Sequence, residues 1–137
     1  MIQIKLLTIN SIKIITTQEV AGQLVNYCRQ GQFAEAIQNL YGQNIVSAEP
    51  DGAPVKETKG LDAVIAKGQQ FNDMVEEIHG MEISDPIVAD KFFSCTMKMD
   101  VTFKGAPRTN MHEVCVYKVE DGKIVREEFF FTPMQHG

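Results

Sequence analysis

Apolar residues in the first part of the chain recur at helical spacing, every three or four positions. From Val20 to Cys28 they form one face of a helix, and Gly31 is expected to end it. Thr16, with Glu19 three residues later, predicts a capping box, in which each side chain satisfies a free backbone N–H group. A first helix is therefore expected from its threonine cap to the glycine.

Two further helices and a short strand are expected before the pattern changes. Apolar positions at helical spacing predict helices over residues 33–41 and 61–75. Between them, residues 44–49 are typical of a strand, and the Pro-Asp-Gly sequence that follows predicts a turn. The remaining residues up to Gly60 are expected to form a loop.

Apolar and polar residues alternate in the second half of the chain. This pattern predicts strands over residues 78–84, 87–88, 92–103, 111–119 and 124–131, separated by segments rich in Pro, Gly and Asp. In the longest strand the odd-numbered residues from position 95 onward are apolar, so one face is buried and the other faces water or a partner. Helices followed by a run of strands are typical of the α+β class.

The chain is expected to fold as one domain over residues 16–137. Its 137 residues are a usual size for a single domain, and no internal repeat, low-complexity tract or linker divides it. Residues 1–15 form a separate segment in which Ile2, Ile4 and Leu6 alternate with polar residues. Two interpretations stay open for this segment: an extra strand, or an arm that packs on a neighbouring molecule.

The register of the last two hairpins decides which side chains share a face. With Pro107 at the centre of its loop, Met99 is expected opposite Cys115. For the last turn, a three-residue loop with a glycine bulge places Cys115 beside Glu127, whereas a two-residue loop places Cys115 beside Glu128. A slip of one residue moves every side chain to the other face, so both alternatives stay open.

Charge and composition argue against several classes of protein. The chain has 13 Lys and Arg residues against 18 Asp and Glu residues, a net charge of -5, which argues against a nucleic-acid-binding groove. No apolar run approaches the ~20 residues that a membrane-spanning helix needs. The first residues lack the features of a signal peptide, so we expect a cytoplasmic protein that binds neither nucleic acid nor membrane.

The cysteines and histidines predict neither disulfides nor a metal site. The cysteines are odd in number and lack C-x-x-C spacing, so they are expected to be buried, reduced thiols. The histidines are scattered, without the spacing of metal ligands. These six residues are Cys28, Cys95, Cys115, His79, His112 and His136.

Three segments of the chain, in this order, resemble a known family. They are GQFAEAIQNLYGQNIVSAEP, which runs from the second helix through the first strand, GLDAVIAKGQQF in the third helix, and VYKVEDGKIVREEFF in the closing hairpin. Over residues 16–132 the sequence resembles the nuclear transport factor 2-like superfamily, in particular its SnoaL-like polyketide cyclase and ketosteroid isomerase-like branch. The resemblance implies a cone-shaped α+β domain, in which helices pack on a strongly curved antiparallel sheet around an apolar pocket.

The same resemblance implies a ligand and a partner. The inner face of the sheet would bind a small hydrophobic molecule without a cofactor, and the outer face would form a homodimer. Val114, Val116 and one ring of the Phe129–Phe131 run face outward and favour that dimer, because exposed apolar patches mark interfaces. The alternative is that the inward residues only fill the core. The expected ligand-binding residues are Phe71, Met97, Met99, Val101, Cys115, Tyr117, Glu127, Phe129 and Phe131.

Glu49 is the first candidate catalytic residue. The segment SAEPDG resembles the ketosteroid isomerase segment in which a carboxylate followed by Pro is the general base. A carboxylate at the apolar mouth of a pocket is desolvated, which raises its affinity for a proton and makes it a usable base next to a carbonyl. The alternative is a solvated acid in a turn at the end of a strand.

Glu113 and Tyr27 are candidates for polarising the oxygen of a substrate. Glu113 lies among apolar neighbours in a strand, and acids are seldom buried without a partner. The resemblance implies an acid on this strand, although the closing hairpin aligns Cys115 with that position and leaves Glu113 one pleat away. It also implies a helical tyrosine, with which Leu24 aligns, and Tyr27 lies one turn later. The alternatives are a rim carboxylate for Glu113 and core packing for Tyr27.

Three functional hypotheses follow from these residues. The first is a cofactor-free isomerase, cyclase or dehydratase of a hydrophobic carbonyl compound, with Glu49 as the base and Glu113 or Tyr27 at the oxygen. The second is a binding protein without turnover, and the third is a dimeric assembly module that uses only its outer face. A buried base close to an oxyanion donor would favour the enzyme.

Overall fold

The computed structural model describes residues 14–132 of the chain. The helices within this range are α2 (Thr17–Arg29), α3 (Phe33–Leu40) and α4 (Leu61–Met74). The predicted capping box starts α2: Thr16 Oγ1 accepts a hydrogen bond from the Glu19 N–H at 3.1 Å, and the Glu19 side chain accepts one from the Thr16 N–H at 3.3 Å. His136 and most of the expected arm over residues 1–15 lie outside the described residues.

The strands of the described chain form one mixed sheet. They are β1 (Tyr41–Ala48), β2 (Glu57–Lys59), β3 (Val75–Ile83), β4 (Ile87–Ala89), β5 (Phe92–Phe103), β6 (Thr109–Glu120) and β7 (Lys123–Phe130). Their order in space is β2-β1-β7-β6-β5-β3, with β4 paired to β5. The expected α+β class is confirmed. The pair of β1 and β7 departs from the expected antiparallel arrangement and is parallel, because most of the chain connects these two strands and no hairpin fixes their direction.

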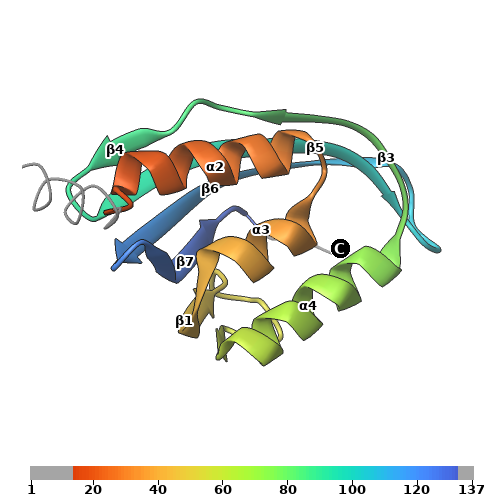
Figure 1. Cartoon of the computed structure of the whole chain (residues 1–137). Helices are drawn as coiled ribbons and strands as arrows, with labels where there is room; N and C mark the ends of the chain where they lie inside the picture. The colour runs from red at the N-terminus through yellow and green to blue at the C-terminus, as the bar shows by residue number, and fades with distance from the viewer. Residues whose placement is uncertain (1–13, 133–137) are drawn as a thin grey trace, which may run out of the picture.

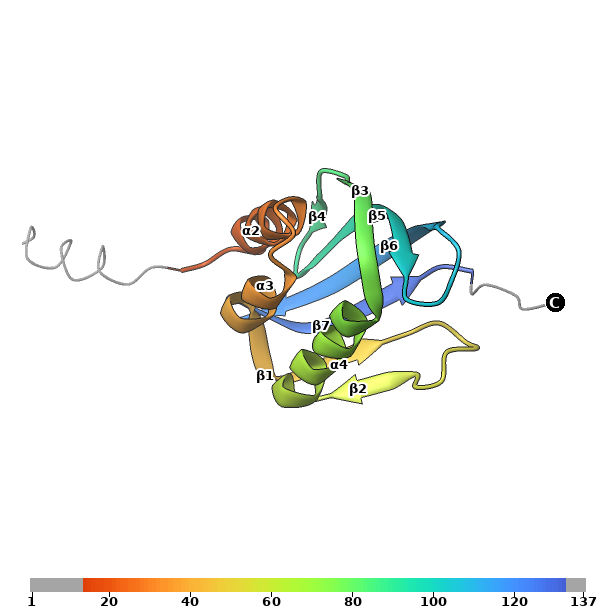
Figure 2. The same ribbon diagram turned by 90° about the vertical axis from the view of Figure 1, so that its right-hand side faces the viewer.

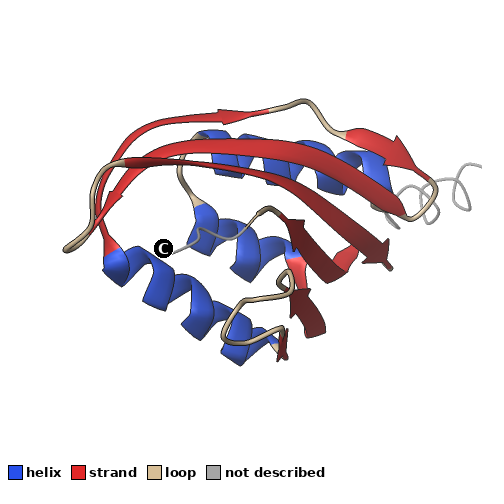
Figure 3. Ribbon diagram, turned by 180° about the vertical axis from the view of Figure 1, so that it is seen from behind, coloured by secondary structure: helices blue, strands red, loops and turns tan. Residues whose placement is uncertain are grey.

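The helices pack against the concave side of the curled sheet. In Figure 1, α2 lies along the long strands, and α3 and α4 lie below it. Figure 2 shows the sheet curling from β3 round to β2, with α4 alongside β1 and β2. From behind, the long strands arch over the helices (Figure 3). Side chains from both layers meet between them: Val20, Leu24, Ile45, Val64 and Ile124 are at most 2% exposed.

The hairpin of β5 and β6 has a register four residues away from the expected one. Cys115 lies opposite Cys95, and not opposite Met99. The turn is centred on Gly105, whose φ of 76° favours glycine, while Pro107 lies beyond it in the connection. The expected pairing was therefore wrong. Because four is an even number, the shift leaves every side chain on the predicted face.

The hairpin of β6 and β7 combines features of both predicted alternatives. Its turn is the two-residue one, with positive φ angles of 51° at Asp121 and 75° at Gly122. A β-bulge early in β7 then shifts the register, so that Cys115 lies opposite Phe129 rather than either predicted glutamate. Glu127 consequently lies on the inner face, as the bulged alternative predicted.

The region between α3 and α4 differs most from the predicted elements. β1 begins at Tyr41, three residues before the predicted strand and at the residue that was expected to close the second helix. β2 lies within the predicted loop and pairs with the edge of β1. Its sequence, Glu-Thr-Lys, is short and polar and shows no alternation, because an edge strand of three residues buries almost nothing.

Candidate active site

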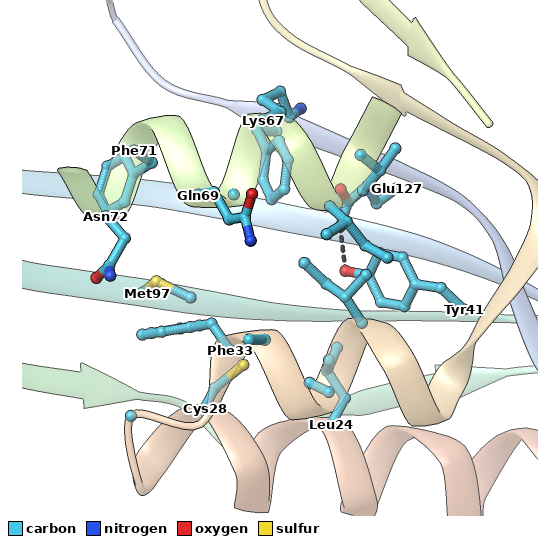
Figure 4. A pocket seen from close by; sticks show the side chains of 18 of the residues that line it. Leu24, Cys28, Phe33, Tyr41, Lys67, Gln69, Phe71, Asn72, Met97 and Glu127 are labelled. Atoms are coloured by element: carbon cyan, nitrogen blue, oxygen red, sulfur yellow. Dashed lines mark hydrogen bonds between the residues drawn. The ribbon is translucent and has the colours of Figure 1, made fainter. Parts of the chain in front are cut away.

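A cavity of about 520 Å³ lies between the helices and the concave face of the sheet. Its walls are mostly apolar and include the rings of Phe33, Phe71 and Phe129 and the thioether of Met97. Figure 4 shows Phe71 and Lys67 projecting from α4 on one side of this space, with Leu24 and Cys28 of α2 on the other. A concave, apolar site of this volume suits a small organic ligand.

Most of the expected ligand-binding residues line this cavity. They are Phe71, Met97, Met99, Tyr117, Glu127, Phe129 and Phe131. The other two, Val101 and Cys115, are fully buried in the core and do not reach the cavity wall. Their face was predicted correctly, but strand alternation does not distinguish a wall residue from one packed behind the wall.

Glu127 is an almost completely buried acid in the cavity wall, with 4% of its surface exposed. One carboxylate oxygen accepts a hydrogen bond from the Tyr41 hydroxyl, drawn as a dashed line in Figure 4. The other accepts one from the Ser47 hydroxyl at 2.6 Å. Burial raises the pKa of Glu127, whereas the two hydroxyl donors and the nearby Lys67 ammonium oppose that rise.

Lys67 connects α4 to the end of β1. Its ammonium donates to Ser47 Oγ at 2.5 Å and to Glu49 Oε1 at 3.0 Å, and it lies 5.5 Å from the centre of the Phe129 ring. Hydrogen bonds therefore run without a break from Glu49 through Lys67 and Ser47 to Glu127. Glu49 lines the cavity, with 22% of its side chain exposed, and is a half-buried acid in an ion pair rather than a solvated one.

Glu113 lines the same cavity from β6, opposite Met97 of β5. It accepts a hydrogen bond from the Cys115 thiol, with sulfur and oxygen 3.7 Å apart, which is a weak interaction. Burial, followed by the negative charge of Glu49, raises the pKa of Glu113 from its ordinary 4.5 to about 7. A carboxyl group with this pKa exists in both protonation states near neutral pH, as an acid–base catalyst requires.

Tyr27 is not among the residues that line the cavity, so the structure does not place it where its expected role at a substrate oxygen requires it. It is half-buried on α2, and its hydroxyl accepts a hydrogen bond from Asn39 Nδ2 at 3.3 Å at the surface. The tyrosine hydroxyl that lies at the cavity is that of Tyr41, at the start of β1. Its pKa is well above its usual value, first because of burial and then because of the charge of Glu127.

Three side chains of the site were missed in the sequence: Tyr41, Ser47 and Lys67. Ser47 precedes Glu49 by two residues in a strand, and this period of two places both on one face. Lys67 lies three residues after Val64 and four before Phe71, on the apolar face of α4. A single lysine on such a face was the signal that could have identified it.

Neither Cys28 nor His79 adds a nucleophile or a base to the site. Cys28 lines the cavity, but burial raises the pKa of its thiol to about 12, which disfavours a thiolate. His79 lies away from the cavity, with Nε2 2.7 Å from Thr102 Oγ1. Within residues 14–132, no group of three or more His, Cys, Asp or Glu side chains is arranged to hold a metal ion.

The sequence of this chain matches a known family over most of its length. The sequence pattern of the SnoaL-like domain matches residues 15–131. The chain belongs to the SnoaL-like family. A crystal structure with 31% sequence identity and a TM-score of 0.81, of a candidate SnoaL-like polyketide cyclase [carbohydrate phosphatase] from Mesorhizobium loti, covers 85% of this chain and 100% of its own.

More distant structures share the SnoaL-like fold. An NTF2-like protein of unknown function from Burkholderia pseudomallei is 16% identical with a TM-score of 0.72, over 86% of this chain and 92% of its own. A protein of unknown function with a cystatin-like fold from Xanthomonas campestris is 16% identical with a TM-score of 0.70, over 85% and 90%. No curated protein matches the sequence significantly.

Membership of the SnoaL-like family establishes the architecture of this domain but not its activity. Folds of this kind carry many unrelated functions, so chemistry has to be argued from the site. None of the helices in the described part of the chain is long and apolar enough to cross a membrane.

Proposed function

We propose that this SnoaL-like protein is a cofactor-independent enzyme that moves a proton on a hydrophobic carbonyl compound, as in an isomerisation, cyclisation or dehydration. The observation that carries the proposal is the pair of unlike carboxyl groups at one apolar cavity. Glu49 is ion-paired with Lys67, whereas the pKa of Glu113 is about 7. Two acids in different environments can divide the roles of base and acid between them.

The proposed reaction begins with a carbonyl compound bound among the aromatic and thioether side chains. The charged Glu49 carboxylate takes a proton from the carbon next to the carbonyl, and the electron pair of that C–H bond moves into an enolate. The protonated fraction of Glu113 donates a hydrogen bond to the developing oxyanion. Return of the proton from Glu49 to another carbon completes an isomerisation, with no net gain or loss of protons.

The family supports this proposal. The Mesorhizobium loti relative is a candidate polyketide cyclase, and polyketides are carbonyl-rich hydrophobic compounds. The second candidate is a binding protein without turnover, which the mostly apolar cavity wall favours. The two functions differ in one property: only the enzyme needs a base that takes up a proton from its ligand.

Proton exchange on a simple ketone tests the proposal directly. We expect the protein to accelerate the replacement of the α-hydrogens of 2-tetralone by deuterium in D2O, followed by proton NMR. Glu49→Gln should lower the catalysed rate by about 100-fold or more, and Glu113→Gln by about 10-fold. The matched control is Glu82→Gln, because Glu82 is exposed on β3 and does not line the cavity.

Two results would count against the enzyme. If the wild-type protein exchanges 2-tetralone no faster than Glu49→Gln does, but 2-tetralone still perturbs the NMR signals of cavity residues, the protein is a binding protein without turnover. Equal loss of rate in Glu49→Gln and Glu82→Gln would show that the carboxylate at the cavity has no special role.

We propose in addition that the outer face of the sheet forms a homodimer. Val114 of β6 and Phe130 of β7 lie opposite each other on this face and are 42% and 47% exposed. Phe92 of β5, also on this face, is 47% exposed. An exposed apolar pair such as Val114 and Phe130 is typical of interfaces. Light scattering should give twice the 15.3 kDa of one chain, and Phe130→Glu should give the single-chain mass.

A further inference from the structure

Lys67 is the only lysine or arginine among the described residues that line the cavity. An ammonium group has three N–H donors. The Lys67 ammonium donates one hydrogen bond to Ser47 Oγ at 2.5 Å and one to Glu49 Oε1 at 3.0 Å, and its nitrogen lies 5.5 Å from the centre of the Phe129 ring. Two of its donors therefore have oxygen acceptors within the protein, and its positive charge lies within cation–π range of the Phe129 ring.

Ser47, one partner of Lys67, belongs to a buried hydrogen-bond network. Ser47 is fully buried, and its hydroxyl donates a hydrogen bond to Glu127 Oε2 at 2.6 Å. The second oxygen of Glu127 is held by the Tyr41 hydroxyl, and Tyr41 is 7% exposed. Neighbouring strands β1 and β7 carry these three residues, and Ser47 pairs with Glu127 in the parallel ladder. The lysine is therefore anchored, through Ser47, to two paired strands of the sheet.

Glu49, in contrast, has little support from its own backbone. It follows the last residue of β1 and precedes Pro50 and a turn. Its backbone N–H donates to the Lys56 carbonyl at 2.7 Å, but the side chain extends toward α4 and is fixed there by Lys67. The orientation of the proposed base thus depends on a residue of another element.

We propose that Lys67 is a positioning residue, whose ammonium is anchored by Ser47, itself hydrogen-bonded to Glu127, and holds the Glu49 carboxylate in one orientation toward a bound substrate. The inference rests on the proposed function, because it assigns a role relative to the base of that reaction. It differs from an anion-binding role, because the ammonium would hold a carboxylate of the protein itself rather than a group of the ligand.

The charge of Lys67 also reaches Glu113. The groups that act on Glu113 are Glu49, Glu127 and Lys67 from neighbouring elements, and Cys115 from its own strand. The two acids raise the pKa of Glu113 and the ammonium lowers it. Removing the cation should consequently raise this pKa, whereas removing the negative charge of Glu49 should lower it. Lys67→Met and Glu49→Gln should therefore shift the pKa of Glu113 in opposite directions. A general loosening of the fold would not produce opposite shifts.

The test combines this titration with the exchange of 2-tetralone. Lys67→Met keeps the length of the side chain and removes its charge, Lys67→Arg restores a charge, and Lys59→Met serves as a matched surface control, since Lys59 is 74% exposed. In Lys67→Met we expect the pKa of Glu113, followed by carboxyl NMR, to rise by about half a unit or more. We expect kcat for exchange to fall by about 10-fold with KM changed less than about 2-fold, and Lys67→Arg to recover part of the rate.

Each outcome bears on one of the two proposals. A rise in KM with unchanged kcat would overturn positioning and make Lys67 a ligand-binding residue. An unchanged kcat together with an unchanged Glu113 titration would overturn any link between Lys67 and the acids. If the wild-type protein does not exchange 2-tetralone, the proposed enzyme fails. The Glu113 titration in Lys67→Met and Lys67→Arg then still decides whether Lys67 controls the charges at the cavity.

Discussion

Glu127 and Glu113 lie on the inner faces of neighbouring strands and border one cavity, yet their environments differ. Glu127 is 4% exposed and receives a hydroxyl group on each carboxylate oxygen. Glu113 is half-buried and receives a weakly donating thiol. The comparison shows what makes a buried acid structural: strong donors fix Glu127 in place, whereas Glu113 is left with a proton that it can exchange.

The physical causes of the two raised pKa values show the same contrast. Burial raises both, but for Glu127 the next causes are hydrogen bonds from Ser47 and Tyr41, which oppose the rise. For Glu113 the next cause is the charge of Glu49, which adds to it. One acid is therefore stabilised by dipoles that point at it, and the other is destabilised by a like charge across the cavity.

The largest effect on stability is expected from removing the structural acid. Glu127→Ala leaves the hydroxyls of Tyr41 and Ser47 buried without their acceptor and opens a void. Unpaired buried donors and a new void should together lower the free energy of unfolding by about 2–4 kcal/mol, measured by urea denaturation. Glu127→Gln keeps the shape of the side chain and one carbonyl acceptor. Its free energy of unfolding should therefore fall by less than half as much as that of Glu127→Ala. Equal losses in both variants would show that the hydroxyl contacts contribute little.

The second prediction concerns the pH dependence that Glu113 gives to stability. Its pKa is about 7 in the folded protein and near 4.5 in the unfolded chain, so the folded state binds the proton more tightly. This contribution is fully present below pH 4.5 and is lost as the pH rises to 7, a change of about 3 kcal/mol at most. Glu113→Gln should therefore be more stable than the wild type at pH 8, by about 1–3 kcal/mol, and similar to it at pH 4.5.

A control separates this effect from other titrating groups. Asp100 pairs with Arg108 at 2.7 Å, and its pKa is lowered, which changes stability with pH in the opposite direction. The difference between the wild type and Glu113→Gln at each pH removes that contribution. A difference that does not depend on pH between 4.5 and 8 would mean that Glu113 titrates normally in the folded protein.

Local patterns in the sequence were sufficient for most of the elements and for the faces of the long strands. The capping box at Thr16 and the alternation in β5 depend on neighbours along the chain, so helix start and strand face could be predicted. The registers could not, because they depend on which residue takes the positive φ of the turn and on a bulge in β7. Apolar periodicity indicates neither feature.

The candidate site shows the same division. Glu49 and Glu113 were visible as acids in apolar surroundings, which is a local signal. The bridge of Lys67 to Ser47 and Glu127 joins α4, β1 and β7, and no local pattern predicts three-way contacts of this kind. Tyr41 was expected to close the second helix and was not considered for the site, whereas the curl of the sheet brings the start of β1 to the cavity.

The third prediction compares two tyrosines of this chain. Tyr41→Phe removes one of the two donors to buried Glu127 and should lower the free energy of unfolding by about 1–2 kcal/mol. Tyr27→Phe removes an exposed contact with Asn39 and should change it by less than about 0.5 kcal/mol. Chemical denaturation of both variants in parallel measures this difference. Equal losses would contradict the view that Glu127 depends on its buried donors.

The smallest expected effect tests whether donor strength alone separates the two acids. Cys115→Ser replaces the thiol beside Glu113 by a stronger hydroxyl donor of similar size, and Cys115→Ala removes the donor. Because the thiol lowers the pKa of Glu113, the serine should lower it further and the alanine should raise it, each by a few tenths of a unit, roughly. Carboxyl NMR titration measures both shifts. The serine variant would give Glu113 part of the environment that Glu127 has, so its exchange of 2-tetralone should also slow near pH 7. Shifts of the same sign in both variants would mean that burial and the charge of Glu49, rather than the donor at Cys115, set the protonation of this acid.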